Sequence, residues 1–253
     1  MLWNSGENKM IKGLILAIQF FTRIPINITV DFNEKNIRYS IFFMPLVGTI
    51  IGGFGGIVYY LIAPHNKLMA SFLTLLITII LTGGLHIDGL ADTFDGFLAN
   101  KDRKKTMEIM KDSRIGTFGV LSIVLHLMFL YILIISIDNV PLAMILSFTN
   151  SRLIASIIIS NKKSAQVNGL GALFHKSNPK KLIILSTIIY LIFLVSINKK
   201  YLIPLVINYI LAEIISNISY KKIDGLTGDV YGTIIELGVL ISLFSFWGVG
   251  EWI

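Results

Sequence analysis

Long apolar runs separated by short polar segments dominate the chain. Seven runs approach or exceed the length that crosses a hydrocarbon core of about 30 Å. They lie at about residues 39–62, 68–87, 115–137, 140–160, 182–197, 201–219 and 230–250. Residues 11–22 are too short to span and are predicted to form an amphipathic or re-entrant helix on the membrane. The pattern predicts an all-α polytopic integral membrane protein, with residues 1–253 forming a single integral-membrane domain.

The composition supports a membrane protein. Hydrophobic residues make up 54% of the chain and charged residues only 15%, where a soluble domain has about a quarter charged. Cysteine is absent, which excludes disulfides, thiolate metal ligands and a cysteine nucleophile. The net charge of +7 comes from basic residues spread between apolar runs. We therefore expect the basic loops to face anionic lipid headgroups, and we expect no nucleic-acid partner.

The basic residues also predict the orientation of the spans. With the N-terminus in the cytoplasm, the outer segments carry only Lys67, Lys199 and Lys200, and all larger basic groups lie inside. This predicts a multi-pass protein of the cell membrane. It also predicts that the polar motifs near residues 88, 114, 169 and 229 meet on the cytoplasmic side, where an active site would open to cytoplasmic substrates.

The first polar motif follows the second apolar run. Asp88, Asp92 and Asp95 would fall within about 60° of one helix face. Three carboxylates on one stripe repel each other unless a cation lies among them, and their hard oxygen atoms favour Mg²⁺ shared with substrate phosphates. Glycines flank these acids and leave room for a ligand. The motif therefore predicts a magnesium site on a membrane enzyme that acts on phosphate esters.

A second motif repeats this spacing at the start of the last run, where Asp229, Thr233 and Glu236 lie at positions i, i+4 and i+7. Glu236 would lie one to two turns inside the membrane, where an unpaired carboxylate is costly and usually functional. Asp229 and Glu236 are therefore added to the predicted metal ligands.

Other polar residues are interpreted with their alternatives left open. His86 is either a base or a hydrogen-bonded boundary residue. Arg152, inside the fourth run, either pairs with an acid such as Glu236 or binds a diphosphate. His126 is interpreted as a core histidine. The helix start after Asp112, Ser113 and Arg114 is either an ordinary helix cap or an anion site made by Arg114 and backbone N–H groups near Gly116.

The motifs together resemble a known family. GLHIDGLADT at 84–93 and EIMKDSRIGT at 108–117 are similar to the hallmark stretches of cobalamin synthase, the adenosylcobinamide-GDP ribazoletransferase family. Further similar stretches follow the family order over nearly the whole chain. They are FTRIP at 21–25 with Arg23, PLVG at 45–48, Ser151-Arg152, the GLG of Gly169 and Gly171, and Thr227-Gly228-Asp229 through Glu236.

The resemblance implies a reaction and its participants. The cobinamide-phosphoryl group of adenosylcobinamide-GDP would pass to α-ribazole or its 5′-phosphate, with release of GMP and a requirement for Mg²⁺. Arg114 and Arg152 would neutralise the leaving GMP, and an aspartate of the first motif or His86 would accept the hydroxyl proton. The substrate-binding residues expected are Arg23, Asp112, Ser113, Gly116, Gly169, Gly171 and Thr227.

Two other functions are weighed against this one. A lipid-directed phosphotransferase of the CDP-alcohol type performs the same step, but Ala91 is followed by Asp92 where that pattern has arginine. A secondary transporter is the least favoured, because its acids would be spread through several spans. A homo-oligomer, or a complex with other cobalamin-assembly enzymes, is left open.

Overall fold

The computed structural model describes residues 9–166, 170–177 and 179–252, and these form a helical bundle. In chain order its elements are α1 (Lys9–Phe21), α2 (Glu34–Ile62), α3 (Lys67–Thr82), α4 (Leu85–Leu98), α5 (Arg103–Ile109), α6 (Thr117–Ser136), α7 (Val140–Asn161), α8 (Leu170–Lys176), α9 (Lys180–Ile197), the 3-10 turn η1 (Lys199–Tyr201), α10 (Leu202–Ile223) and α11 (Gly228–Trp252).

The apolar helices confirm the predicted fold class. Within the described ranges, six segments are long and apolar enough to cross a membrane: α2, α6, α7, α9, η1 with α10, and α11. A seventh candidate is α3 followed by α4, with an 88° bend between them. The predicted helix at 11–22 is present as α1, whose 13 residues are too few to span a bilayer.

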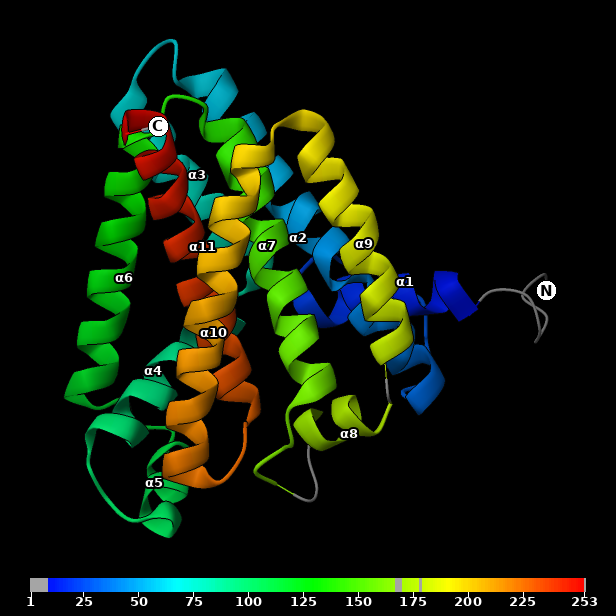
Figure 1. Cartoon of the computed structure of the whole chain (residues 1–253). Helices are drawn as coiled ribbons and strands as arrows, with labels where there is room; N and C mark the ends of the chain where they lie inside the picture. The colour runs from blue at the N-terminus through cyan, green and yellow to red at the C-terminus, as the bar shows by residue number, and fades with distance from the viewer. Residues whose placement is uncertain (1–8, 167–169, 178, 253) are drawn as a thin grey trace.

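Helix α7 is the centre of the bundle. Most of its surface is buried, and it packs against α2, α9, α10 and α11 (Figure 1). Its closest neighbour is α2, because Gly48 and Gly52 lie directly against the backbone of Phe148 and Met144 and leave no room for a side chain. Helices α6 and α9 lie at the outside and expose apolar side chains along most of their length.

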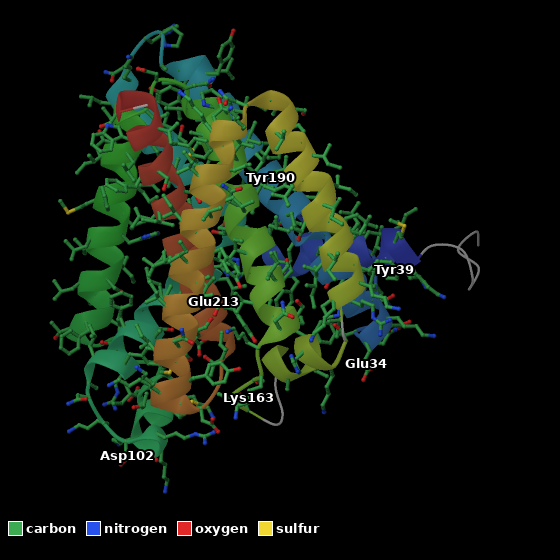
Figure 2. All side chains as sticks on the ribbon, viewed as in Figure 1. Glu34, Tyr39, Asp102, Lys163, Tyr190 and Glu213 are labelled. Carbon is green, nitrogen blue, oxygen red and sulfur yellow. The ribbon has the colours of Figure 1, made fainter. Side chains whose placement is uncertain are left out.

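The two ends of the bundle differ in character. Helices α4, α5 and α8 lie at one end, which we call the α4 end, while the α2–α3 turn and the C-terminal part of α11 lie at the other (Figure 1). Asp102, which caps the start of α5, and Lys163, which follows α7, are both at the α4 end (Figure 2). The α4 end therefore gathers the loops in which the sequence placed its polar motifs.

One predicted span is shorter than expected. The run predicted at 68–87 ends as a helix at Thr82, because Gly83 and Gly84 both adopt left-handed backbone conformations, with φ of 64° and 71°. L-residues rarely adopt such angles, whereas glycine does so readily. The chain then turns by 88° into α4, so that α4 runs across the end of the bundle (Figure 1).

Candidate active site at the α4 end

Two glycines bring the acidic motifs of α4 and α11 together. A Cβ atom placed on Gly89 would lie 2.9 Å from both Cα and the carbonyl oxygen of Asp229, and one on Gly232 would lie 3.2 Å from the carbonyl oxygen of His86. The Thr233 hydroxyl also donates a hydrogen bond to the Gly89 carbonyl oxygen at 3.2 Å. Because the two backbones touch, residues 88–92 lie beside the first turn of α11, as the sequence predicted.

Three carboxylates form the acidic cluster at this crossing: Asp88, Asp92 and Asp229. Asp88 is exposed, while Asp92 and Asp229 are half-buried. Burial raises the pKa of Asp92 to about 7, and repulsion from Asp88, Asp229 and Asp95 adds to this shift. The cluster is thus open to solvent and short of positive charge.

The acidic cluster fits a magnesium ion only in part. Within the described segments, no group of three His, Asp or Glu side chains is arranged to hold a metal ion by itself. Mg²⁺ usually takes one or two carboxylates and completes its octahedron with water and substrate phosphates. The repulsion that raises the pKa of Asp92 is the kind that a divalent cation relieves. The predicted metal site therefore stays a prediction.

Asp95 points away from this cluster. Its buried carboxylate accepts hydrogen bonds from the backbone N–H groups of Gly116, at 2.7 Å, and Gly119, at 2.8 Å. The N-terminus of α6 was expected to be a candidate anion site for substrate, with Gly116 as a donor. The structure corrects this expectation for Gly116, because the anion that its N–H binds is Asp95 of the same chain.

The loop before α6 lies at the surface. Arg114 donates to Asp112 from Nε at 3.0 Å and from a terminal nitrogen at 2.7 Å, and its side chain is 87% exposed. These bonds lower the pKa of Asp112 to about 2 and raise that of Arg114. Ser113 is exposed beside them. The predicted substrate-binding residues here are accessible, and Arg114 is paired with an acid of its own loop.

A buried polar group lies deeper, between α4, α6, α7 and α11. Glu236 is hydrogen-bonded to Nε2 of His126 at 3.0 Å, one to two turns away from Asp229 along α11. The sequence interpretation of His126 missed this pair. An ionisable group at that depth requires a partner, but which helix supplies it depends on how the helices are rotated in the bundle.

Arg152 and His86 belong to the same buried region. Arg152 donates to the Ser151 hydroxyl at 3.0 Å and lies over the Phe148 ring at 4.8 Å, and no ion pair joins it to an acid of the described chain. The imidazole Nε2 of His86 is buried and has no hydrogen-bond partner among the described residues. Burial, with Arg152 nearby, lowers the pKa of His86 to about 4, so that its ring is neutral.

The remaining predicted residues are Arg23, Thr227, Gly171 and Gly169. Arg23 lies exposed against Gly83 in the turn before α4, and its backbone N–H donates to the Leu81 carbonyl oxygen at 2.6 Å. Thr227 caps the start of α11 and donates to Asp229 at 3.3 Å. A Cβ atom placed on Gly171 of α8 would lie 3.4 Å from the ring of Tyr231. Gly169 lies outside the described residues.

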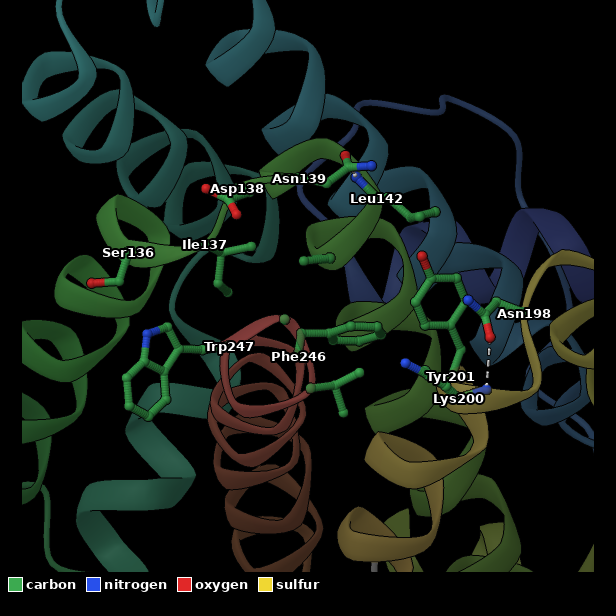
Figure 3. A pocket seen from close by; sticks show the side chains of 13 residues that line it. Ser136, Ile137, Asp138, Asn139, Leu142, Asn198, Lys200, Tyr201, Phe246 and Trp247 are labelled. Atoms are coloured by element: carbon green, nitrogen blue, oxygen red, sulfur yellow. Dashed lines mark hydrogen bonds between the residues drawn. The ribbon is translucent and has the colours of Figure 1, made fainter. Parts of the chain in front are cut away.

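A cavity lies at the opposite end of the bundle. Its volume is about 330 Å³, and it is lined by the ends of α6 and α11, the start of α7 and the α9–α10 turn (Figure 3). Asp138, Tyr201, Phe246 and Trp247 are among its lining residues. It shares no residue with the acidic cluster, so the site predicted from the motifs is at the α4 end and not in this cavity.

Comparison with known proteins agrees with the motif order. The pattern of the cobalamin-5-phosphate synthase family matches residues 13–247. The chain is 41% identical over 250 residues to an adenosylcobinamide-GDP ribazoletransferase of Treponema denticola, covering 92% of this chain and 96% of the relative. It is 40% identical over 247 residues to one of Clostridium novyi, covering 94% and 99%. No solved structure matches the chain. The chain therefore belongs to the cobalamin-5-phosphate synthase family.

Proposed function

We propose that this transferase moves the cobinamide-phosphoryl group of adenosylcobinamide-GDP onto α-ribazole or its 5′-phosphate. A ribose hydroxyl oxygen that is free in both acceptors, and so is not the 5′ oxygen, forms a bond to the phosphorus nearest cobinamide. The bond from that phosphorus to GMP breaks, and the hydroxyl proton passes to the protein. The proposal is supported by the reaction named for the relatives of this chain and by one structural observation. That observation is the acidic cluster of Asp88, Asp92 and Asp229, built from two helices at one end of the bundle.

The cluster would hold Mg²⁺, which when bound neutralises the paired phosphates and stabilises the charge that develops on the leaving GMP. Asp88, Asp92 and Asp229 are the residues proposed to hold it. Asp88 is exposed, so a substrate diphosphate can reach the cluster from solvent. Glu236 is excluded from this set, since it is buried and bonded to His126.

Two residues are suited to accept the hydroxyl proton. Asp92 is only half-buried, and its carboxylate can accept the proton through the oxygen that does not hold Mg²⁺. His86 is neutral, and its Nε2 has no protein partner in the described structure, but its side chain is buried. Accessibility favours Asp92 as the base.

The two arginines contribute differently. Arg114 is exposed at the rim and can exchange Asp112 for a phosphate oxygen at little cost, because surface ion pairs are weak. Arg152 is fully buried, so in this arrangement it can act on the substrate only through the electrostatic field of its positive charge. We therefore assign contact with the leaving GMP to Arg114. Arg152 is assigned a supporting role, in which its positive charge acts on the site without contact.

We further propose that the α4 end faces the cytoplasm of a bacterial cell, where nucleotide substrates are available. The support is the charge pattern: the loops at the α4 end carry the large basic groups, including Lys101, Arg103, Lys104 and Lys105 on and before α5. The opposite end carries Lys67, Lys199 and Lys200.

The decisive experiment measures GMP release by the purified protein from adenosylcobinamide-GDP and α-ribazole, with and without Mg²⁺. We expect release to require both substrates and the metal, and to be lost in Asp92→Asn. Asp102→Asn is the matched control, because it removes an acid at the same end that only caps α5. Retained turnover in Asp92→Asn, or turnover of CDP-diacylglycerol and an alcohol in place of these substrates, would contradict the proposal.

A further inference from the structure

Helix α6 begins without a cap of its own. Gly116 is its N-cap residue, and no side chain of that segment accepts from the first N–H groups of the helix. Such groups require an acceptor, because they have no partner within the helix, and their partial positive charge favours an anion. Asp95 of α4 supplies the acceptor and the negative charge. One of its carboxylate oxygens accepts a hydrogen bond from the N–H of Gly116, and the other accepts one from the N–H of Gly119.

The glycines at both positions leave space for this contact. A Cβ atom on Gly116 or on Gly119 would collide with the carboxylate of Asp95. Two separate features of the sequence therefore serve one contact: an acid on α4 and two glycines three residues apart on α6. This is a specific interhelical cap that fixes the start of α6 on the side of α4.

The cap also fixes what precedes α6. Asp112, Ser113 and Arg114 end two residues before Gly116, and Asp95 lies one helical turn after Asp92 of the acidic cluster. Because Gly116 is bound to Asp95, the loop that carries Arg114 ends at a fixed point beside the acidic cluster. At the other end of this loop, the buried side chain of Met110 packs against Gly96 of α4, so the loop is held to α4 at both ends.

We propose that Asp95 is a positioning residue and not a metal ligand: it holds the 112–116 loop beside the acidic cluster, so that Arg114 meets the phosphates of the nucleotide substrate. Both of its oxygens are occupied by backbone donors, and its carboxylate is buried. This inference rests on the proposed function for the role of Arg114, but the cap itself does not.

Two variants separate the roles of Asp95. Asp95→Asn removes the charge and one acceptor, whereas Gly119→Ala leaves the carboxylate intact and displaces it. If Asp95 positions the loop, both variants raise the KM for adenosylcobinamide-GDP by about tenfold, and both keep the half-saturating Mg²⁺ concentration within about twofold of wild type. Val120→Ala, at an exposed neighbouring position of α6, is the control and keeps wild-type kinetics.

A metal ligand would behave otherwise. An increase of about tenfold or more in half-saturating Mg²⁺ for Asp95→Asn but not for Gly119→Ala would overturn the proposal. Wild-type KM in both variants would overturn it too.

A second measurement does not depend on turnover. Hydrogen–deuterium exchange on the intact protein in detergent should show faster exchange at residues 116–119 in both variants than in wild type and in Val120→Ala. Unchanged exchange in both would overturn the cap. If the wild-type protein releases no GMP but the exchange result holds, the proposed function fails while the cap stands.

Discussion

Replacing Gly89 by alanine tests whether the contact between α4 and α11 builds the active site. The new Cβ would lie 2.9 Å from Cα and from the carbonyl oxygen of Asp229. Ordinary contacts between such atoms begin near 3.5 Å, so the helices must separate by about 0.6 Å. Overpacking of this kind costs about 1–3 kcal/mol, offset by up to about 1 kcal/mol from the better helix propensity of alanine.

The effect on catalysis should exceed the effect on stability. A displacement approaching 1 Å at a reacting centre costs up to about 100-fold in rate, so we expect kcat for GMP release to fall by about 10- to 100-fold in Gly89→Ala. The half-saturating Mg²⁺ concentration should rise as well, because Asp229 moves away from Asp88 and Asp92.

The assay compares initial rates of GMP release and thermal melting in detergent for wild type, Gly89→Ala and Gly53→Ala. Gly53 lies within α2, and a Cβ atom there meets nothing within 4 Å, so this control should keep wild-type activity. A Gly89→Ala protein with wild-type kcat and wild-type Mg²⁺ dependence would refute the reasoning that the helix crossing forms the site.

Four further outcomes are expected. Because the pKa of Asp92 is raised to about 7, its protonation competes with Mg²⁺ below that pH. The half-saturating Mg²⁺ concentration should therefore rise by up to about tenfold from pH 7 to pH 6. A half-saturating concentration that does not change with pH would contradict the assignment of Asp92 as a metal ligand. The same shift means that the folded state holds the proton more tightly than the unfolded state, so the metal-free protein should melt at a lower temperature at pH 8 than at pH 6. His126→Ala leaves Glu236 buried without its hydrogen bond and should destabilise the fold by about 3–5 kcal/mol; the double variant with Glu236→Gln should recover part of the loss in a melting experiment, and additive losses would argue against the pair. Since the chain has no cysteine, a single cysteine at Lys104 should react with an impermeant maleimide only in inverted vesicles, and one at Lys199 only in right-side-out cells; the reverse pattern would invert the topology.

The sequence predicted the helices and the meeting of the two acidic motifs for clear physical reasons. An apolar run inside a bilayer must form a helix, because only then do its backbone N–H and C=O groups have hydrogen-bond partners. The distribution of basic residues then predicts which ends of the spans lie on the same side of the membrane. Once Asp88 and Asp229 are assigned to the same side, their proximity needs only that α4 and α11 be neighbours, and Gly89 and Gly232 make that contact close.

What the sequence did not predict depends on the rotation and tilt of helices. Asp88, Asp92 and Asp95 share a face by spacing, yet the 14-residue α4 lies between two partners, so that Asp95 faces α6 while the others face α11 and solvent. The pairing of Glu236 with His126, and not with Arg152, likewise depends on which side of α6 and α7 faces α11. Two glycines at 83 and 84 signalled a break, but not that the chain would turn by 88°.

The exposed apolar surface of α6 has a consequence for how the enzyme responds to its membrane. Its 20 residues span about 30 Å, close to the thickness of a typical hydrocarbon core. In lipids with shorter acyl chains, a helix of fixed length accommodates the mismatch by tilting. Because the first turn of α6 is fastened to Asp95, that tilt would pivot about the capped end, so the loop that carries Arg114 keeps its place while the far end of α6 moves. Turnover is thus expected to be insensitive to lipid chain length as long as Asp95 holds the start of α6.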